Sequence, residues 1–154
     1  MVKEILYDKI TGNFVELPEG EFSLTIGRAS SNDIPVPIHA KRGEEKLGEI
    51  LRGINPPNMK KLEDLCRTIS SQSHAVLTRE SGKVYIKDNN STGGTEVKTN
   101  SGVVKPVFSG EKHPIFNGYA LFLGKYPLEY LAVENPSSLN LPSGNEFKIY
   151  RTIV

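Results

Sequence analysis

The sequence predicts an all-β protein, in which short antiparallel strands form a sandwich or a barrel. Fourteen glycines and ten prolines are spread along the 154 residues and divide the chain into short pieces. Several of these pieces alternate apolar and polar residues with a period of two, which is typical of strands with one buried face. Frequent turn signals between such pieces indicate sandwich or barrel architecture.

The expected strands begin near the N-terminus. "EILY" leads through the turn "DKITGN" to "FVEL", and "FSLTIGR" follows the turn "PEGE". Farther along, "HAVLTRE" and "KVYIKD" flank Ser81-Gly82, a strong signal for a tight β-hairpin. "GYALFLG" and "LEYLAVE" are the last strands expected in the sandwich, for which we predict the range 1–134.

A helical insertion interrupts the strands at about residues 38–69. Its apolar residues recur at helical spacing in two stripes, separated by Asn55-Pro56-Pro57, which can end one helix and begin another. Glu63 and Arg67 are expected to pair on the exposed side of the second helix. The stripes are Leu47, Ile50, Leu51 and Ile54, then Met59, Leu62, Cys66 and Ile69.

Residues 135–154 form a different kind of segment. "ENPSSLNLPSGN" has the composition of a linker, and "EFKIYRTIV" has the β-branched and aromatic content of one more strand. Such a strand can pair with its own sheet or with the sheet edge of another molecule, so the extension allows oligomers.

Composition narrows the functional classes. The 19 basic residues nearly balance the 18 acidic ones, so no overall field favours nucleic acid. The single cysteine, Cys66, excludes an internal disulfide and fits the cytoplasm. No apolar run is long enough to span a membrane, and the N-terminus lacks the features of a signal peptide.

Catalysis has little support in the sequence. The three histidines have no carboxylate or cysteine partners at metal-ligand spacing, and no glycine-rich loop ends in Lys-Ser or Lys-Thr. We therefore expect neither an enzyme nor a bound metal or cofactor.

Three polar segments lie at the ends of expected strands. They are Gly27-Arg28, the segment "SSQSH" with Ser71 and His74, and the long turn "DNNSTGGT" that begins at Asp88. In a β-sandwich, loops from distant parts of the chain can gather at one end and form a binding surface.

The order and chemistry of these segments resemble the forkhead-associated (FHA) domain, a module that binds phosphothreonine peptides. The family pattern is Gly-Arg at a strand end, then Ser-x-x-His, then an Asp-x-x-Ser-Thr-Asn-Gly-Thr type of turn. The resemblance covers about residues 3–134 apart from the insertion, and it implies an eleven-strand type of β-sandwich. It also implies a threonine-phosphorylated partner protein and an upstream Ser/Thr kinase.

By this resemblance, Arg28 and Ser71 would bind the phosphate directly, while Gln72 and Thr92 would contact phosphate or peptide. A phosphothreonine carries about −1.5 to −2 charges and three strong acceptor oxygens, which suit an arginine fork and short hydroxyl donors. The resemblance assigns structural support of the site to Gly27, His74, Asp88, Ser91 and Thr95.

Gly93 departs from the family pattern, which usually has Asn at this position to hold the peptide backbone. Glycine keeps the turn but offers no side-chain hydrogen bond, so Gly93→Asn is expected to tighten peptide binding. The alternative is a scaffold or assembly domain that keeps the fold without phosphate recognition. The insertion adjoins the expected binding face, where Lys41, Arg42 or Lys46 could add peptide contacts or the insertion could cover the site.

Overall fold

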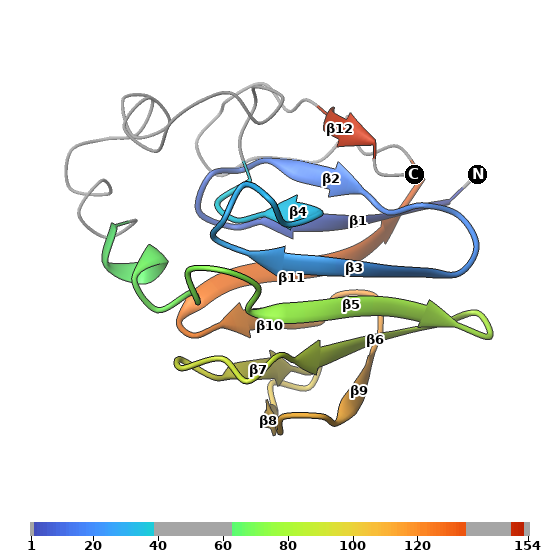
Figure 1. The fold of residues 1–154 in the computed structure, drawn as a ribbon. Coiled ribbons are helices and arrows are strands. Elements are labelled where there is room, and N and C mark those ends of the chain that lie inside the picture. Colours follow the sequence, from blue (N-terminus) through green and yellow to red (C-terminus); the bar gives the residue numbers. More distant parts are fainter. Residues whose placement is uncertain (1, 39–62, 135–148, 153–154) are drawn as a thin grey trace.

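The protein is a sandwich of two β-sheets, seen in a computed structural model that describes residues 2–38, 63–134 and 149–152 (Figure 1). One sheet has seven strands in the order β12-β2-β1-β11-β10-β7-β8, and the other has five in the order β4-β3-β5-β6-β9. The all-β prediction is confirmed. The strands are β1 (Lys3–Asp8), β2 (Phe14–Glu16), β3 (Phe22–Gly27), β4 (Ile34–Pro35), β5 (Ala75–Glu80), β6 (Lys83–Asp88), β7 (Thr95–Lys98), β8 (Val104–Val107), β9 (Lys112–Ile115), β10 (Ala120–Leu123), β11 (Tyr126–Val133) and β12 (Ile149–Thr152).

The hairpin of β5 and β6 forms where the sequence predicts it. Ser81 and Gly82 have φ values of 51° and 78° between the two strands. Two consecutive residues with positive φ are the geometry of a type I′ turn, whose twist matches that of the flanking strands. The six paired residues of each strand run from Ala75↔Asp88 to Glu80↔Lys83.

The hydrophobic core lies between the two sheets. Alternate residues of β5 and β10 point inward, and Leu77, Leu121 and Leu123 have no exposed surface. The period-two pattern of these strands therefore places one face in the core, as expected from the sequence. Cys66 and Ile69 are also buried in this core, so the end of the insertion packs against the sandwich.

The two-helix insertion is not shown. The described residues contain a single short helical segment at 63–66, and the remainder of the expected insertion, 39–62, lies outside the described residues. Arg67 forms its ion pair with Asp64, at 3.7 Å, and not with Glu63 as the helical spacing predicted. The backbone N–H of Arg67 still donates to the carbonyl of Glu63 at 3.1 Å, so the backbone keeps its helical spacing here, and only the side chain pairs with Asp64 instead of Glu63.

Asp8 holds the start of the insertion against the sandwich. Its carboxylate is fully buried and accepts hydrogen bonds from the backbone N–H of Ile38 (2.9 Å) and from the Tyr126 hydroxyl (2.7 Å). The N–H groups of Ile10 and Thr11 donate to it as well, at 2.9 and 3.0 Å. Burial raises the pKa of Asp8, and the hydrogen bonds oppose that rise. Asp8 thus anchors Ile38, the last described residue before position 63, to the sandwich.

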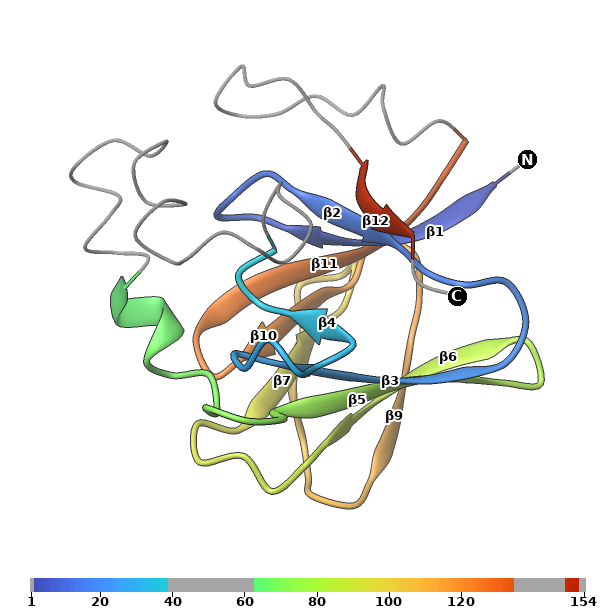
Figure 2. The ribbon, with the colours of Figure 1, turned by 45° about the horizontal axis from the view of Figure 1, so that its top comes forward.

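The C-terminal segment supplies β12, the edge strand of the seven-stranded sheet next to β2. β12 pairs in parallel with β2, and the pairing register shifts between Ile149 and Thr152. It lies next to β2 in both ribbon views (Figures 1 and 2). This strand therefore pairs within its own chain.

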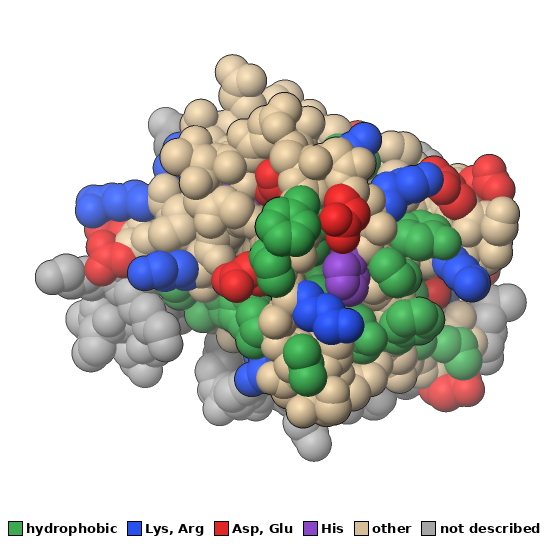
Figure 3. Space-filling model, turned by 90° about the horizontal axis from the view of Figure 1, so that it is seen from below, with side chains coloured by type: hydrophobic (Ala, Val, Ile, Leu, Met, Phe, Trp, Pro, Cys, Tyr) green, Lys and Arg blue, Asp and Glu red, His purple; other side chains and the backbone are tan. Residues whose placement is uncertain are grey.

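Exposed hydrophobic side chains lie around β8 and β9, at the bottom of the view in Figure 1. They include Phe108 and Phe116, which are 64% and 54% exposed, together with Val103 and Val104. Seen from below, hydrophobic side chains are interspersed with basic side chains, acidic side chains and a histidine (Figure 3). Charged groups therefore lie between the apolar side chains on this face.

Four connections gather at one end of the sandwich. The β3–β4 loop, the segment before β5, the β6–β7 loop and the β10–β11 turn all lie at the left in Figures 1 and 2. The three polar segments identified in the sequence belong to the first three of these connections. The fold therefore brings together residues that are far apart in the chain.

Candidate functional site

Gly27 allows the first two loops to approach closely. It is the last residue of β3, and a Cβ atom added there would overlap the carbonyl oxygen of Gln72. A side chain at this position would therefore push the two loops apart. The backbone N–H of Arg28 donates to the carbonyl of Ser70 at 3.3 Å, and the Arg28 side chain is exposed.

Asn32 joins the same two loops from within. This residue is only 6% exposed, and its Nδ2 donates to the carbonyl oxygens of Ala29 (2.9 Å) and Gln72 (2.7 Å). Buried amide groups are hydrogen-bonded in native proteins, and this one stabilises both loops. Sequence reasoning missed Asn32, although it lies in the polar stretch "ASSNDI" that directly follows Gly27-Arg28.

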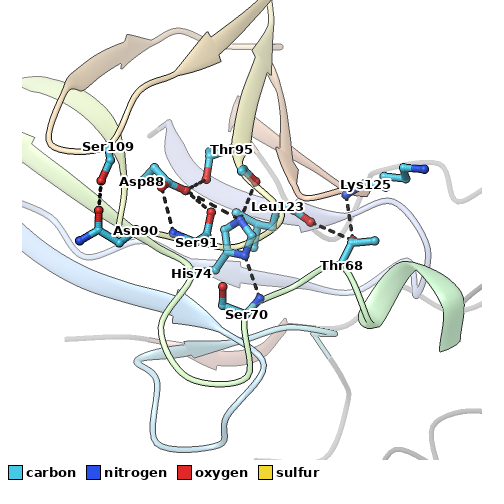
Figure 4. A network of polar contacts seen from close by, with 11 residues as sticks. Thr68, Ser70, His74, Asp88, Asn90, Ser91, Thr95, Ser109, Leu123 and Lys125 are labelled. Atoms are coloured by element: carbon cyan, nitrogen blue, oxygen red, sulfur yellow. Dashed lines mark hydrogen bonds and ion pairs between the residues drawn. The ribbon is translucent and has the colours of Figure 1, made fainter.

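His74 is completely buried and connects the second and third loops (Figure 4). The N–H of Ser70 donates to its Nδ1 at 2.9 Å, so Nδ1 is an acceptor. Nε2 therefore carries the ring proton and donates to the carbonyl of Gly94, at 2.7 Å. Burial lowers the pKa of His74, although the bond to Gly94 and the charge of Asp88 oppose this. The neutral ring holds the two loops together.

Asp88 organises the long polar turn that follows β6. Its buried carboxylate accepts hydrogen bonds from the Ser91 N–H (3.1 Å), the Ser91 hydroxyl and the Thr95 hydroxyl (2.6 Å) (Figure 4). Asn90 and Gly94 have φ values of 53° and 77°, which suit asparagine and glycine. The turn is thus closed by its own polar side chains, leaving Thr92 exposed.

Gly93 is a contact site for the end of the insertion. A Cβ atom added to Gly93 would overlap the carbonyl oxygen of Thr68. Thr68 also lies against Gly124, where an added Cβ would come within 2.6 Å of the Thr68 hydroxyl oxygen. The N–H of Lys125 donates to that hydroxyl at 2.9 Å (Figure 4). Close packing with Thr68 therefore gives a physical reason for glycine at position 93.

A pocket of about 780 Å³ opens between the loops. Its lining residues are uncharged and, apart from Ala29, polar. One of them is Ser73, whose hydroxyl is buried without a hydrogen-bond partner among the described residues. Ser71 and Gln72 line this pocket, whereas Arg28, Thr92 and Gly93 lie on the adjoining loops. The full lining is Thr25, Ala29, Ser31, Asn32, Ser70, Ser71, Gln72, Ser73, Asn89 and Asn90.

The described residues show no metal centre and no membrane span. Within them, no three His, Cys, Asp or Glu side chains are placed so that they could hold a metal ion. Nor does any helix in the described ranges have the length and apolar character needed to cross a bilayer.

Comparison with known proteins identifies the family. A family model described as "FHA domain" matches residues 24–124, about two thirds of the chain. No curated protein matches the sequence.

Solved structures give the same fold. An FHA domain of an Arabidopsis thaliana hypothetical protein is 18% identical, with a TM-score of 0.57, covering 89% of this chain and 91% of that chain. Mycobacterium tuberculosis EmbR, solved with a low-affinity phosphopeptide, is 16% identical, with a TM-score of 0.53. The match covers 84% of this chain and 24% of EmbR. The FHA domain of CT664 from Chlamydia trachomatis is 14% identical, with a TM-score of 0.52. The match covers 84% of this chain and 96% of that chain.

The two sheets and the polar loops gathered at one end define the class of the protein as an all-β sandwich with the fold of the solved FHA domains. The family match places the chain more closely: it belongs to the FHA domain family, whose members bind phosphothreonine. The resemblance drawn from the three sequence motifs is confirmed at the level of the family.

Proposed function

We propose that this chain docks reversibly onto a threonine-phosphorylated partner protein through the loops at the β3–β4 end of the sandwich. Arg28 and Ser71 bind the phosphate in this proposal, and Gln72 and Thr92 contact the phosphate or the peptide beside it. The observation that carries it is the close approach of Gly27 and Gln72, which fixes the Arg28 loop against the Ser71 loop.

The chemistry of Arg28 supports this role. Its side chain is exposed, and none of the described acidic residues forms an ion pair with it. A free guanidinium presents a rigid fork of donors that matches the oxygens of a phosphate group. The side chains of Ser71, Gln72 and Thr92 are also exposed and can supply uncharged donors.

The remaining motif residues support the site in this proposal. His74 and Asp88 are buried, and their hydrogen bonds connect the loop backbones that carry the exposed groups. Polar side chains held in this way keep a binding site preorganised, which lowers the cost of ordering it on binding. The supporting set is Gly27, His74, Asp88, Ser91 and Thr95.

The phosphopeptide in the EmbR structure also supports the proposal, since that protein shares this fold. The module acts in the cytoplasm downstream of a Ser/Thr kinase, and a phosphatase resets it. It has no catalytic activity of its own and needs no cofactor. β12 pairs within its own chain, so the proposal assigns it no part in joining copies.

We do not favour the scaffold alternative, because its main sequence argument, the glycine at position 93, has another explanation. The absence of Asn at position 93 suggested that a hydrogen bond to the peptide is lost. The close packing of Gly93 against the Thr68 carbonyl is a separate reason why no side chain is present there.

The test is a titration of the chain against a library of phosphothreonine peptides, with unphosphorylated copies as controls. The proposal expects binding that depends on the phosphate and requires Arg28. Equal binding, or none, in both sets would overturn it in favour of a scaffold.

A further inference from the structure

The seven-stranded sheet carries apolar side chains on both of its faces. Leu6, Val15 and Tyr130 belong to the main core, between this sheet and the five-stranded one. Successive side chains of a strand point to opposite faces, so the residues next to these three point outward. A second hydrophobic cluster lies on that outer face, and we call it the outer cluster. It consists of Ile5, Tyr7 and Phe14, with Leu131 and Val133 packed against them.

The outer cluster is covered. Ile5 and Phe14 have no exposed surface, and Tyr7 is 8% exposed. The members of the cluster belong to β1, β2 and β11, and Ile5 lies on β1, between the other two strands. Strands of one sheet cannot bury their own outer face, because a sheet face is buried only by a second layer. Since the structure contains a single chain, a further segment of that chain lies over Ile5.

The directions of the strands show where this segment comes from. β11 ends at Val133, which pairs with Lys3 at the start of β1. β12 begins at Ile149, which pairs with Phe14, and Phe14 pairs with Tyr7 near the end of β1. β11 and β12 therefore run in the same direction within one sheet, with β1 and β2 between them. A connection between two parallel strands of a sheet crosses over one of its faces.

The outer face is the one that this crossover takes. The inner face is filled by the main core, which packs against the five-stranded sheet. Fifteen residues (149 − 133 − 1) connect the two strands. The crossover covers roughly 20 Å, from three strand spacings of about 4.8 Å and four residues of about 3.3 Å each. Because fifteen extended residues reach about 50 Å, the connection is long enough to pass over Ile5.

The sequence of the connection suits an apolar face. Residues 135–145 contain no charged side chain, and Leu139 and Leu141 stand two positions apart. Side chains two positions apart in an extended segment point to the same side. The two leucines can therefore face the sheet together, and their burial removes apolar surface from water.

We propose that the outer face of β1, β2 and β11 is the docking surface for residues 135–148 of this same chain, with Leu139 and Leu141 packed on the outer cluster. The C-terminal segment is a strap that closes this face against a second copy. The inference goes beyond phosphothreonine binding and does not depend on it.

Crosslinking in the full chain tests which molecule occupies the face. Leu131→Cys combined with Leu141→Cys places one thiol on the outer cluster and one on the strap, and a short bismaleimide should join them within one chain. Leu141→Cys combined with Lys87→Cys, on β6 of the other sheet, is the matched control and should give no internal crosslink. Cys66 should not react, because it is buried and burial raises the pKa of its thiol to about 12.

Charged substitutions on the strap give a second test. Leu139→Asp with Leu141→Asp should lower the melting temperature by about 5 °C or more and should cause self-association in sedimentation, because the outer cluster is then exposed. Ser138→Asp with Asn140→Asp adds the same charge at the alternate positions of the segment. This control should keep both the melting temperature and the monomer.

Three results would contradict the inference. A crosslink that joins two chains would make a second copy the occupant of the face. Failure of the Leu131 and Leu141 cysteines to crosslink, in a variant that keeps its melting temperature, would remove the strap from the outer cluster. Equal effects of the two aspartate pairs would show that the leucines have no special place on this face.

Discussion

The carbonyl oxygen of Thr68 lies so close to Gly93 that no side chain fits between them. Thr68 belongs to the end of the insertion, and Gly93 belongs to the turn whose sequence most resembles the FHA pattern. The glycine that departs from that pattern is therefore the point at which the insertion rests on the sandwich. This relationship changes what is expected of substitutions there.

Gly93→Asn is expected to lower the melting temperature and not to tighten phosphopeptide binding. The new side chain must displace the Thr68 backbone, and overpacking of this kind costs about 1–3 kcal/mol. Thermal unfolding and peptide titration of the same sample measure both effects. Thr92→Asn, at the exposed neighbouring position, serves as the stability control. Tighter binding at an unchanged melting temperature would show that the Thr68–Gly93 contact rearranges without cost. It would also show that the absence of an Asn side chain at position 93 limits affinity in the natural sequence.

Arg28→Ala is expected to remove phosphothreonine binding and to leave stability nearly unchanged. A hydrogen bond to a charged group contributes about 1.5–3 kcal/mol, or roughly ten- to hundredfold in affinity. The Arg28 side chain is exposed, so its loss should change the free energy of unfolding by about 0.5 kcal/mol or less. Isothermal titration and chemical denaturation measure the two quantities, with Lys83→Ala as the control. A large loss of stability would make Arg28 a structural residue.

Asn32→Ala is expected to reduce both stability and affinity, although Asn32 need not touch the ligand. Truncation leaves the carbonyl of Gln72 without its buried donor, which costs about 1–3 kcal/mol. The segment with Ser71 then loses its fixed position beside Arg28. Ser30→Ala, at an exposed position of the same loop, is the matched control. Unchanged affinity in the Asn32 variant would show that Gly27 packing alone aligns the loops.

Acidification is expected to destabilise the fold through His74. Burial lowers the pKa of His74 from 6.5, so the unfolded chain binds a proton at a higher pH than the folded one. The stability contributed by neutral His74 is complete above about pH 6.5 and decreases as the pH falls toward the lower folded-state value. Denaturant unfolding between pH 8 and pH 5 measures this effect in a background in which the other two histidines, His39 and His113, are replaced by Gln. An NMR titration that gives His74 a pKa at or above its ordinary value would contradict this prediction.

Local sequence patterns were sufficient to predict much of the fold. Ser81-Gly82 and the alternating residues around it specify the β5–β6 hairpin, because positive φ and period-two burial are properties of a few adjacent residues. The helical insertion shows where such patterns stop being sufficient. Cys66 and Ile69 of its second stripe are buried in the core, yet the described helix ends at residue 66, and Arg67 forms its ion pair with Asp64 instead of Glu63.

The sequence by itself determined the class of this protein, an FHA-like β-sandwich. The short alternating strands indicated the sandwich, and the order of the three polar motifs, which places Arg28, Ser71 and Thr92 at strand ends, indicated the family. Only the tertiary structure decided which residues hold those motifs together. The contacts of Asn32 with Gln72 and of Thr68 with Gly93 join residues 40 and 25 positions apart (72 − 32 and 93 − 68). No local periodicity encodes such pairs, because they arise from the close packing of loops that the two sheets bring to one end.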